Sequence, residues 1–146
     1  HLMFSTVHSN DSNKDTLNNV LATKQFVVNM VTEDLVAQMN MTSQPISANE
    51  SEFELAGLTP IASSLVLPPR VKESKITMEC EMVHHYKLEN SKTGGATIVI
   101  GKIVLFHIDE SVLLDNYKIN LETYQPIARL AGSNYSKIGE IFSLKR

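Results

Sequence analysis

Residues 12–29, SNKDTLNNVLATKQFVVN, pass from a polar loop through a short helix into an apolar strand. The apolar positions of the helix repeat at the i, i+3, i+4 spacing, at Leu17, Val20 and Leu21. Asp15 is a suitable N-cap residue, and the repeat ends near Lys24. From residue 25 to residue 31 both faces are mostly apolar, which predicts a strand deep in a sheet.

Further strands are predicted on both sides of this stretch. Residues 2–7 are rich in β-branched and aromatic side chains. Residues 75–83 alternate between polar and apolar side chains, which indicates a half-buried strand. Its apolar face comprises Ile76, Met78, Cys80 and Met82. Residues 97–108 form a longer apolar strand in which Gly101 indicates a bulge or a bend. We expect the last two strands to pair as an antiparallel hairpin with a long connection.

Short helices and loops account for the middle of the chain. A second helix is predicted from Thr32, because two acidic residues follow in its first turn. Residues 42–52 are a polar loop, residues 54–60 a connector, and the Pro-Pro pair at 68–69 ends any regular element. The sum predicts a mainly β fold with short helices, organised as one domain over residues 1–146.

The composition argues against several classes of function. Of the 146 residues, 42% are hydrophobic and 20% are charged, and the net charge is −3. A nucleic-acid groove needs a surplus of Lys and Arg, so we expect no nucleic-acid partner. No apolar run approaches the roughly 18 residues that span a bilayer, and one cysteine, Cys80, suits a reducing compartment. We therefore expect a soluble, cytoplasmic protein. Because the chain opens at His1 and runs directly into a strand, we also expect upstream sequence to be missing.

The start of the first predicted helix has the chemistry of an anion site. Backbone N–H groups at a helix N-terminus attract anions. Lys14 adds a positive charge and Thr16 adds a hydroxyl donor, so these groups converge where a phosphate monoester could bind. Asp15 would cap the helix rather than contact the anion, because two negative groups repel. Taken alone, these residues favour an ordinary, well-capped surface helix over an anion site.

The order of several short motifs resembles the flavin-reductase-like, FMN-binding split-barrel family. K-D-T-x-x-N at residues 14–19 is followed by Q-F-V-V-N at 25–29, where the family has E-F-V-V-N. Further matching segments are E-F at 52–53, G-L at 57–58, P-P-R-V at 68–71, Ser74 and E-C at 79–80. Residues 126–132, P-I-A-R-L-A-G, followed by Tyr135, resemble P-x-x-R-L-G-G-x-x-Y, with Ala131 in place of the first Gly.

This resemblance implies a six-stranded Greek-key split β-barrel, here without the family's N-terminal strands, that binds FMN near the interface of a homodimer. It implies that Lys14 and Thr16 hold the FMN phosphate and that Asn19 fixes the helix or the adjoining loop. Arg129 would lie near the cofactor or the dimer interface, and a surface ion pair is its alternative role. The implied cofactor site comprises Lys14, Asp15, Thr16, Asn19, Ser5, Ser9, Arg129, Gly132 and Tyr135.

The implied activity is hydride transfer from NADH or NADPH to FMN, with the protein supplying position and electrostatics. The first alternative is a non-catalytic FMN-binding or electron-carrier module. The second is a structural or interaction domain on a degenerate barrel. No catalytic side chain and no metal site is predicted.

The histidines and the cysteine have structural interpretations. His84 and His85 are adjacent on a strand and would point to opposite faces, which does not suit a shared metal ion. His107 lies in an apolar run and is predicted to be a hydrogen-bonded strand residue. Cys80 shares the apolar face of its strand and is predicted to be a small buried hydrophobic residue.

Overall fold

The computed structural model describes residues 1–7, 13–88 and 95–145, which form two compact units. The first unit comprises His1–Asn29, Pro60–Val71 and Thr77–His107. The second unit comprises Met30–Thr59, Lys72–Ile76 and Ile108–Arg146. Each unit is built around its own hydrophobic cluster.

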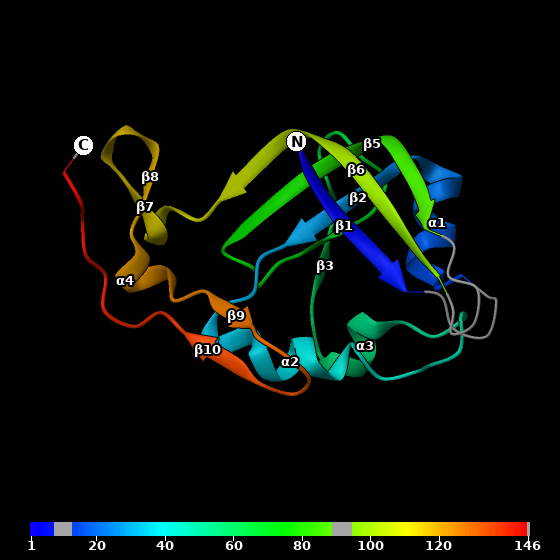
Figure 1. The fold of residues 1–146 in the computed structure, drawn as a ribbon, viewed down its shortest axis with the longest axis horizontal. Coiled ribbons are helices and arrows are strands. Elements are labelled where there is room, and N and C mark those ends of the chain that lie inside the picture. Colours follow the sequence, from blue (N-terminus) through cyan, green and yellow to red (C-terminus); the bar gives the residue numbers. More distant parts are fainter. Residues whose placement is uncertain (8–12, 89–94, 146) are drawn as a thin grey trace. The chain divides into compact units, whose positions relative to one another are not determined.

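A curled, four-stranded sheet dominates the first unit (Figure 1). Its strands are β1 (Leu2–Val7), β2 (Gln25–Asn29), β5 (Ile76–Leu88) and β6 (Ala96–Ile108). The order across the sheet is β1-β6-β5-β2, with β1 antiparallel to β6 and β2 antiparallel to β5. β5 and β6 are neighbours, as predicted, and their arrows run in opposite directions in Figure 1.

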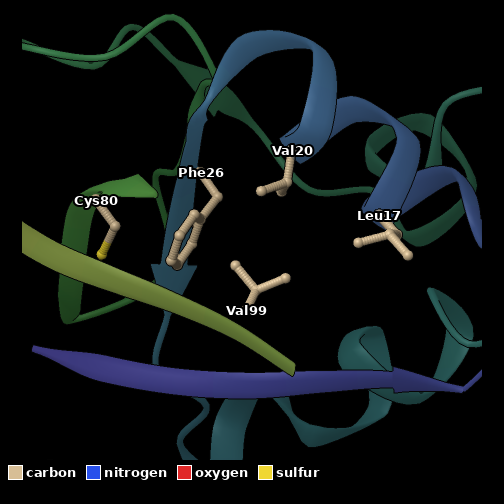
Figure 2. Packing of buried hydrophobic residues seen from close by; sticks show 5 residues of the cluster. All are labelled: Leu17, Val20, Phe26, Cys80 and Val99. Carbon is tan, nitrogen blue, oxygen red and sulfur yellow. The ribbon is translucent and has the colours of Figure 1, made fainter. Parts of the chain in front are cut away.

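The helix α1 (Asp15–Thr23) packs on one face of this sheet (Figure 2). The buried cluster between them consists of Leu17, Val20, Phe26, Cys80 and Val99. Because residues three apart on a helix share a face, α1 buries its Leu17–Val20 stripe and leaves its polar side exposed. Burial of each large side chain in such a cluster contributes roughly 1.5–3 kcal/mol. The helix ends as predicted, at Lys24, which has a left-handed backbone with φ 61°.

Gly101 lies where the ring of Phe26 meets β6. A Cβ atom at this position would lie 2.4 Å from Phe26 Cζ, so glycine is what allows the ring to come this close. The one-to-one pairing of β1 with β6 ends at Leu2 and Gly101. The glycine therefore serves close packing.

The position of β2 differs from its prediction. Its apolar character on both faces predicted a strand deep in the sheet, but β2 is an edge strand. A segment that includes β3 (Pro60–Ile61) and β4 (Arg70–Val71) lies beside it, with β4 in contact with β2. The Val71 N–H donates to Asn29 Oδ1 at 2.9 Å, which ties β4 to β2. Burial by this irregular segment produces the same hydrophobic pattern as burial inside a sheet.

The burial of β5 also differs from its prediction. The alternating sequence predicted one exposed polar face, but Thr77 and Glu79 are 1% and 0% exposed. Glu79 is buried because Ser64 and Leu65 lie over it and donate their N–H groups to its carboxylate. The alternation holds only further along, where Glu81 is exposed and Met82 is half-buried.

The second unit consists of short elements around a small cluster of Ile76, Val112 and Tyr124. These elements are η1 (Glu33–Leu35), α2 (Val36–Met41), α3 (Glu52–Ala56), η2 (Glu110–Val112), β7 (Leu113–Leu114), η3 (Asp115–Tyr117), β8 (Lys118–Ile119), α4 (Leu121–Tyr124), β9 (Ile127–Arg129) and β10 (Tyr135–Lys137). The helix predicted from Thr32 is confirmed as η1 followed by α2, whereas α3 replaces a predicted loop and connector. None of the helices formed by the described residues has both the length and the apolar character that crossing a membrane requires.

Candidate functional site

The first turn of α1 presents backbone donors that no described side chain caps. Lys14 is the N-cap residue, with φ −65° and ψ 149°, and its side chain makes no capping hydrogen bond. Its carbonyl accepts from the N–H groups of Leu17 and Asn18. The N–H groups of Asp15 and Thr16 have no acceptor among the described residues. Asp15 is thus the first helical residue and not the predicted N-cap, and lysine, which carries no acceptor, cannot replace it.

Two side chains add to this group of donors. Lys14 and Thr16 are both exposed, and neither side chain has a hydrogen-bond or ion-pair partner in the described part of the chain. One helix turn further on, Asn19 is also exposed. Two N–H groups without an acceptor in the described part of the chain, an ammonium and a hydroxyl lie at the positive end of a helix. Together they form a set of donors that suits an anion such as a phosphate monoester.

A groove of about 460 Å³ adjoins this turn, between α1, β2 and residues 67–69 of the first unit. It is lined by Thr16, Asn19, Val20, Ala22, Thr23, Gln25, Phe26, Val27, Leu67, Pro68 and Pro69. Thr16 belongs both to the first turn and to the groove, so an anion at the turn could be continuous with a group in the groove. The volume lies within the range of about 300–1,000 Å³ that is typical of small-molecule sites.

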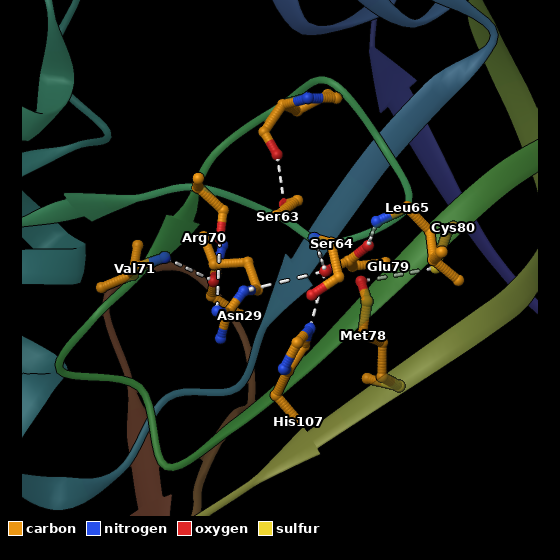
Figure 3. Close-up of polar contacts among 12 residues, drawn as sticks. Asn29, Ser63, Ser64, Leu65, Arg70, Val71, Met78, Glu79, Cys80 and His107 are labelled. Atoms are coloured by element: carbon orange, nitrogen blue, oxygen red, sulfur yellow. Dashed lines mark hydrogen bonds and ion pairs between the residues drawn. The ribbon is translucent and has the colours of Figure 1, made fainter.

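Figure 3 shows a buried carboxylate, Glu79, bonded to residues 64–65 of the segment whose residues 67–69 line the groove. Glu79 Oε1 accepts from the Ser64 N–H at 2.7 Å and from His107 Nε2 at 2.6 Å, and Oε2 accepts from the Leu65 N–H at 2.6 Å. Arg70 Nε lies 3.8 Å from Oε1, which makes an ion pair but not a hydrogen bond. Sequence analysis predicted His107 to be a hydrogen-bonded strand residue, and this contact confirms it.

The charge state of Glu79 follows from these partners. Burial raises the pKa of this carboxyl, but the hydrogen bonds from Ser64, His107 and Leu65 outweigh burial and hold the pKa below its usual value. Glu79 is therefore ionised at neutral pH. Because an ionised carboxylate can only accept, His107 Nε2 is the donor in their shared bond.

In the second unit, the predicted residues Arg129, Gly132 and Tyr135 lie together on one small hairpin. β9 and β10 pair antiparallel, with Tyr135 opposite Arg129. Arg129 Nη2 donates to the Gly132 carbonyl at 3.1 Å, and it forms no ion pair with a described residue. Gly132 has φ 58°, a left-handed conformation that favours glycine at the turn, whereas Ala131 beside it has no such requirement.

The remaining predicted residues have simple environments. Ser5 is exposed on β1, and Ser9 lies outside the described residues. His84 and His85 are exposed on β5, and the described residues include no group of three or more His, Cys, Asp or Glu side chains arranged for a metal ion. Cys80 is fully buried, which confirms its prediction as a core residue, and burial raises the pKa of its thiol to about 11.

The sequence from residue 3 to residue 124 matches the flavin reductase like domain family. An uncharacterised protein of Aquifex aeolicus is 38% identical to the chain over 137 residues, which cover 93% of the chain and 67% of that protein. The chain belongs to the flavin reductase like domain family.

Two solved structures extend this result to the fold. Nitrilotriacetate monooxygenase component B from Bacillus cereus is 38% identical, with a TM-score of 0.91 over 97% of this chain and 70% of that one. A putative flavin reductase with a split barrel domain from Shewanella frigidimarina is 25% identical, with a TM-score of 0.80 over 99% of this chain and 70% of that one. The resemblance that the motifs predicted is therefore confirmed, and the fold is the mainly β, split-barrel fold of flavin reductase like domains.

Sequence analysis of this flavin reductase like chain missed the Glu79 cluster. The alternating pattern of β5 assigned Glu79 to a solvated face, because hydrophobic periodicity does not reveal a loop that folds back over a strand. Two signals were present: a histidine inside the apolar run 105–108, which needs a polar partner, and the family motifs at residues 68–71 and 79–80. These signals point to the same cluster only once the structure brings the segments together.

Proposed function

We propose that this flavin reductase like domain binds FMN, with the FMN phosphate at the first turn of α1. The observation that carries the proposal is the uncapped N-terminus: the N–H groups of Asp15 and Thr16 have no acceptor among the described residues, and a lysine stands where a capping side chain is usual. A surface helix without a ligand gains about 1 kcal/mol from a Ser, Thr, Asp or Asn cap. An anion that binds here replaces that cap, so the arrangement favours a binding site over an ordinary surface helix.

The groove beside α1 suits the uncharged part of the cofactor. Thr16 and Asn19 line it next to the phosphate donors, and Phe26, Val27 and Pro68 give it apolar walls. A ligand with a charged end and a flat, largely apolar end would therefore place the first at the helix turn and the second in the groove. FMN has this shape, and this is the fit that the described residues offer.

The residues of the chain act by binding and positioning. Lys14 would neutralise the phosphate charge, and Thr16 with the two N–H groups would fix its orientation through charge-assisted hydrogen bonds. Asp15 adds a carboxylate to the first helical turn, where it interacts favourably with the helix dipole. When bound, FMN supplies the redox chemistry, accepting a hydride from a reduced nicotinamide.

We further propose that residues 1–146 act as one domain of an NAD(P)H-dependent flavin reductase that functions as a cytoplasmic homodimer. Asn19 and Ser5 would adjoin the phosphate site. The hairpin with Arg129, Gly132 and Tyr135 would contact the cofactor or the partner subunit. Support for the reductase activity comes from the family, since the domain is named for it. The other candidate, an FMN-binding electron carrier, shares the same phosphate site and differs only in failing to oxidise NAD(P)H.

The test is the double substitution Lys14→Ala with Thr16→Ala, assayed by FMN titration. Loss of a charged and a neutral phosphate contact should weaken FMN binding by about 2–4 kcal/mol. Lys102→Ala, which removes an exposed lysine on β6, is the matched control and should leave the affinity unchanged. An unaltered affinity of the double variant would place the phosphate elsewhere. Mixing the protein with FMN and NADH or NADPH then separates the two candidates, because an electron carrier would leave the nicotinamide absorbance constant.

A further inference from the structure

One wall of the groove is a loop whose only internal hydrogen bond among the described residues runs from the Ser63 hydroxyl to the Pro68 carbonyl. Residues 62–69 connect β3 and β4, which pair at only two positions. Among the described residues, no backbone N–H of this loop donates to a backbone carbonyl. The loop is instead attached to the sheet by side chains: the N–H groups of Ser64 and Leu65 donate to Glu79, and that of Leu67 donates to Gln25 Oε1 at 2.8 Å.

Glu79 makes the strongest of these attachments. Its two carboxylate oxygens accept from consecutive N–H groups of the loop, and both bonds are shorter than 2.8 Å. His107, on β6, donates to the same carboxylate and fixes its orientation from the side of the sheet. The groove-lining residues Leu67 and Pro68 lie two and three positions after Leu65, so their place depends on where Glu79 holds the loop as well as on the bond from Leu67 to Gln25.

We propose that Glu79, oriented by His107, is a positioning residue that sets the wall of the α1 groove and thereby the affinity for its ligand. The inference rests on the proposed function for the identity of that ligand, FMN. Stability alone is a weak reason for such a cluster, because well-packed apolar residues often replace a buried ion pair without loss of stability. A carboxylate that accepts three hydrogen bonds and pairs with an arginine does what an apolar residue cannot, since it selects one conformation of the loop above it.

The substitution Glu79→Gln tests this directly, because it keeps the shape of the side chain. A glutamine oxygen can accept from one loop N–H, but the amide –NH₂ then faces the other, so one of the two bonds is lost. We expect the Ser64 and Leu65 amides, followed by NMR hydrogen exchange, to exchange about 100-fold faster than in the unsubstituted protein. Glu81→Gln is the matched control, since Glu81 is exposed on the same strand, and it should leave both amides protected.

The same variants, titrated with FMN, test the effect on the groove. Glu79→Gln should bind FMN about tenfold more weakly, while Glu81→Gln should bind it as the unsubstituted protein does. Exchange of amides in the α1–β2 cluster should speed up by a smaller factor than exchange of the Ser64 and Leu65 amides, which distinguishes a displaced wall from general destabilisation. His107→Leu should weaken FMN binding in the same direction, and His107→Gln, which restores a donor, should recover it. These two variants also carry the test if Glu79→Gln does not fold.

The outcomes separate this inference from the proposed function. If the unsubstituted protein binds FMN and Glu79→Gln frees the two amides without changing the affinity, the positioning role is wrong and the FMN site stands. If the two amides remain protected in Glu79→Gln, the wall does not depend on the carboxylate and the inference also fails. If the unsubstituted protein does not bind FMN, the proposed function is wrong, and the predicted effect of Glu79 on FMN affinity is wrong too. Amide exchange still decides whether Glu79 holds the loop.

Discussion

The first turn of α1 and the Glu79 cluster are both polar, but the hydrogen-bonding groups of the first lack partners among the described residues and those of the second are paired. At the helix turn, donors outnumber acceptors: Lys14, Thr16 and two backbone N–H groups have no partner among the described residues. Glu79 is 0% exposed, and its carboxylate accepts three hydrogen bonds from its neighbours. A site that must take up a ligand keeps its donors free, and a site that must hold a shape uses them internally. Substitutions at the first region should therefore act mainly on binding, and substitutions at the second region should act mainly on stability, with an effect on binding only through the loop that Glu79 holds.

The largest expected effect is on stability, from Glu79→Leu. Removing the carboxylate leaves the N–H groups of Ser64 and Leu65 and the His107 ring without their acceptor. It also removes the ion-pair partner of Arg70. Breaking a buried charge cluster from one side costs about 3–5 kcal/mol. We expect urea denaturation to show a free energy of unfolding lower by that amount.

The control for this loss is Glu81→Leu, on the exposed part of the same strand. Surface substitutions of this kind stay within about 0.5 kcal/mol. Equal losses in the two variants would mean that the Glu79 cluster contributes no more than an exposed glutamate, and the contrast between the two regions would disappear.

The pH dependence of stability gives a second, smaller effect at the same cluster. The pKa of Glu79 is held below the usual 4.5 in the folded protein, so its stabilising contribution is complete above pH 4.5 and is lost as pH falls through the folded pKa. Glu79→Gln lacks this ionisation. We expect the variant to be less stable at neutral pH by about 1–3 kcal/mol and the difference to shrink as the pH is lowered below 4.5.

Other carboxylates do not obscure this comparison. Asp34, Glu73 and Asp109 also have lowered pKa values in the folded protein, but they titrate in the unsubstituted protein and the variant alike. The difference between the two denaturation curves therefore isolates Glu79. A difference that stays constant down to pH 3 would show that the folded carboxylate gains nothing from its ionised state.

The two regions also differ in how far the sequence predicts them. The first turn of α1 lies within a continuous segment, so helix periodicity and the residue types predicted its place, with an error of one residue in the N-cap. The Glu79 cluster joins residues 64–65, 70, 79 and 107, which come from separate segments. Local patterns carry no information on which segments meet. The alternation of β5 therefore gave the wrong burial for Glu79 although it gave the right strand.

The same limit explains the error in β2. An apolar segment is buried by whatever covers it, and a neighbouring strand or an irregular segment leaves the same pattern in the sequence. The structure places residues 60–71 beside β2, tied to it through Asn29 and Gln25. Conversely, Gly101 was noticed in the sequence, but its reason, the ring of Phe26, lies on another strand.

The smallest expected effect comes from a substitution at the N-cap of α1, and it has opposite signs for stability and for FMN binding. Lys14 has the extended backbone of an N-cap without a capping side chain. Lys14→Ser would supply an oxygen for the free N–H groups, and we expect the free energy of unfolding to rise by about 1 kcal/mol. FMN binding should weaken in the same variant, because the charge is gone and the serine oxygen competes for the donors that the phosphate needs.

Lys14→Ala is the control that separates these two causes. It removes the charge without adding a cap, so FMN binding should weaken while stability stays within about 0.5 kcal/mol. If Lys14→Ser gives no gain in stability, the N–H groups of the first turn already have a partner, and the idea of free donors is wrong. If it gives the gain and still binds FMN fully, the phosphate does not bind at this turn. A gain in stability together with a loss of FMN affinity is expected only where the N–H groups of the first helical turn lack a capping side chain and bind the ligand instead.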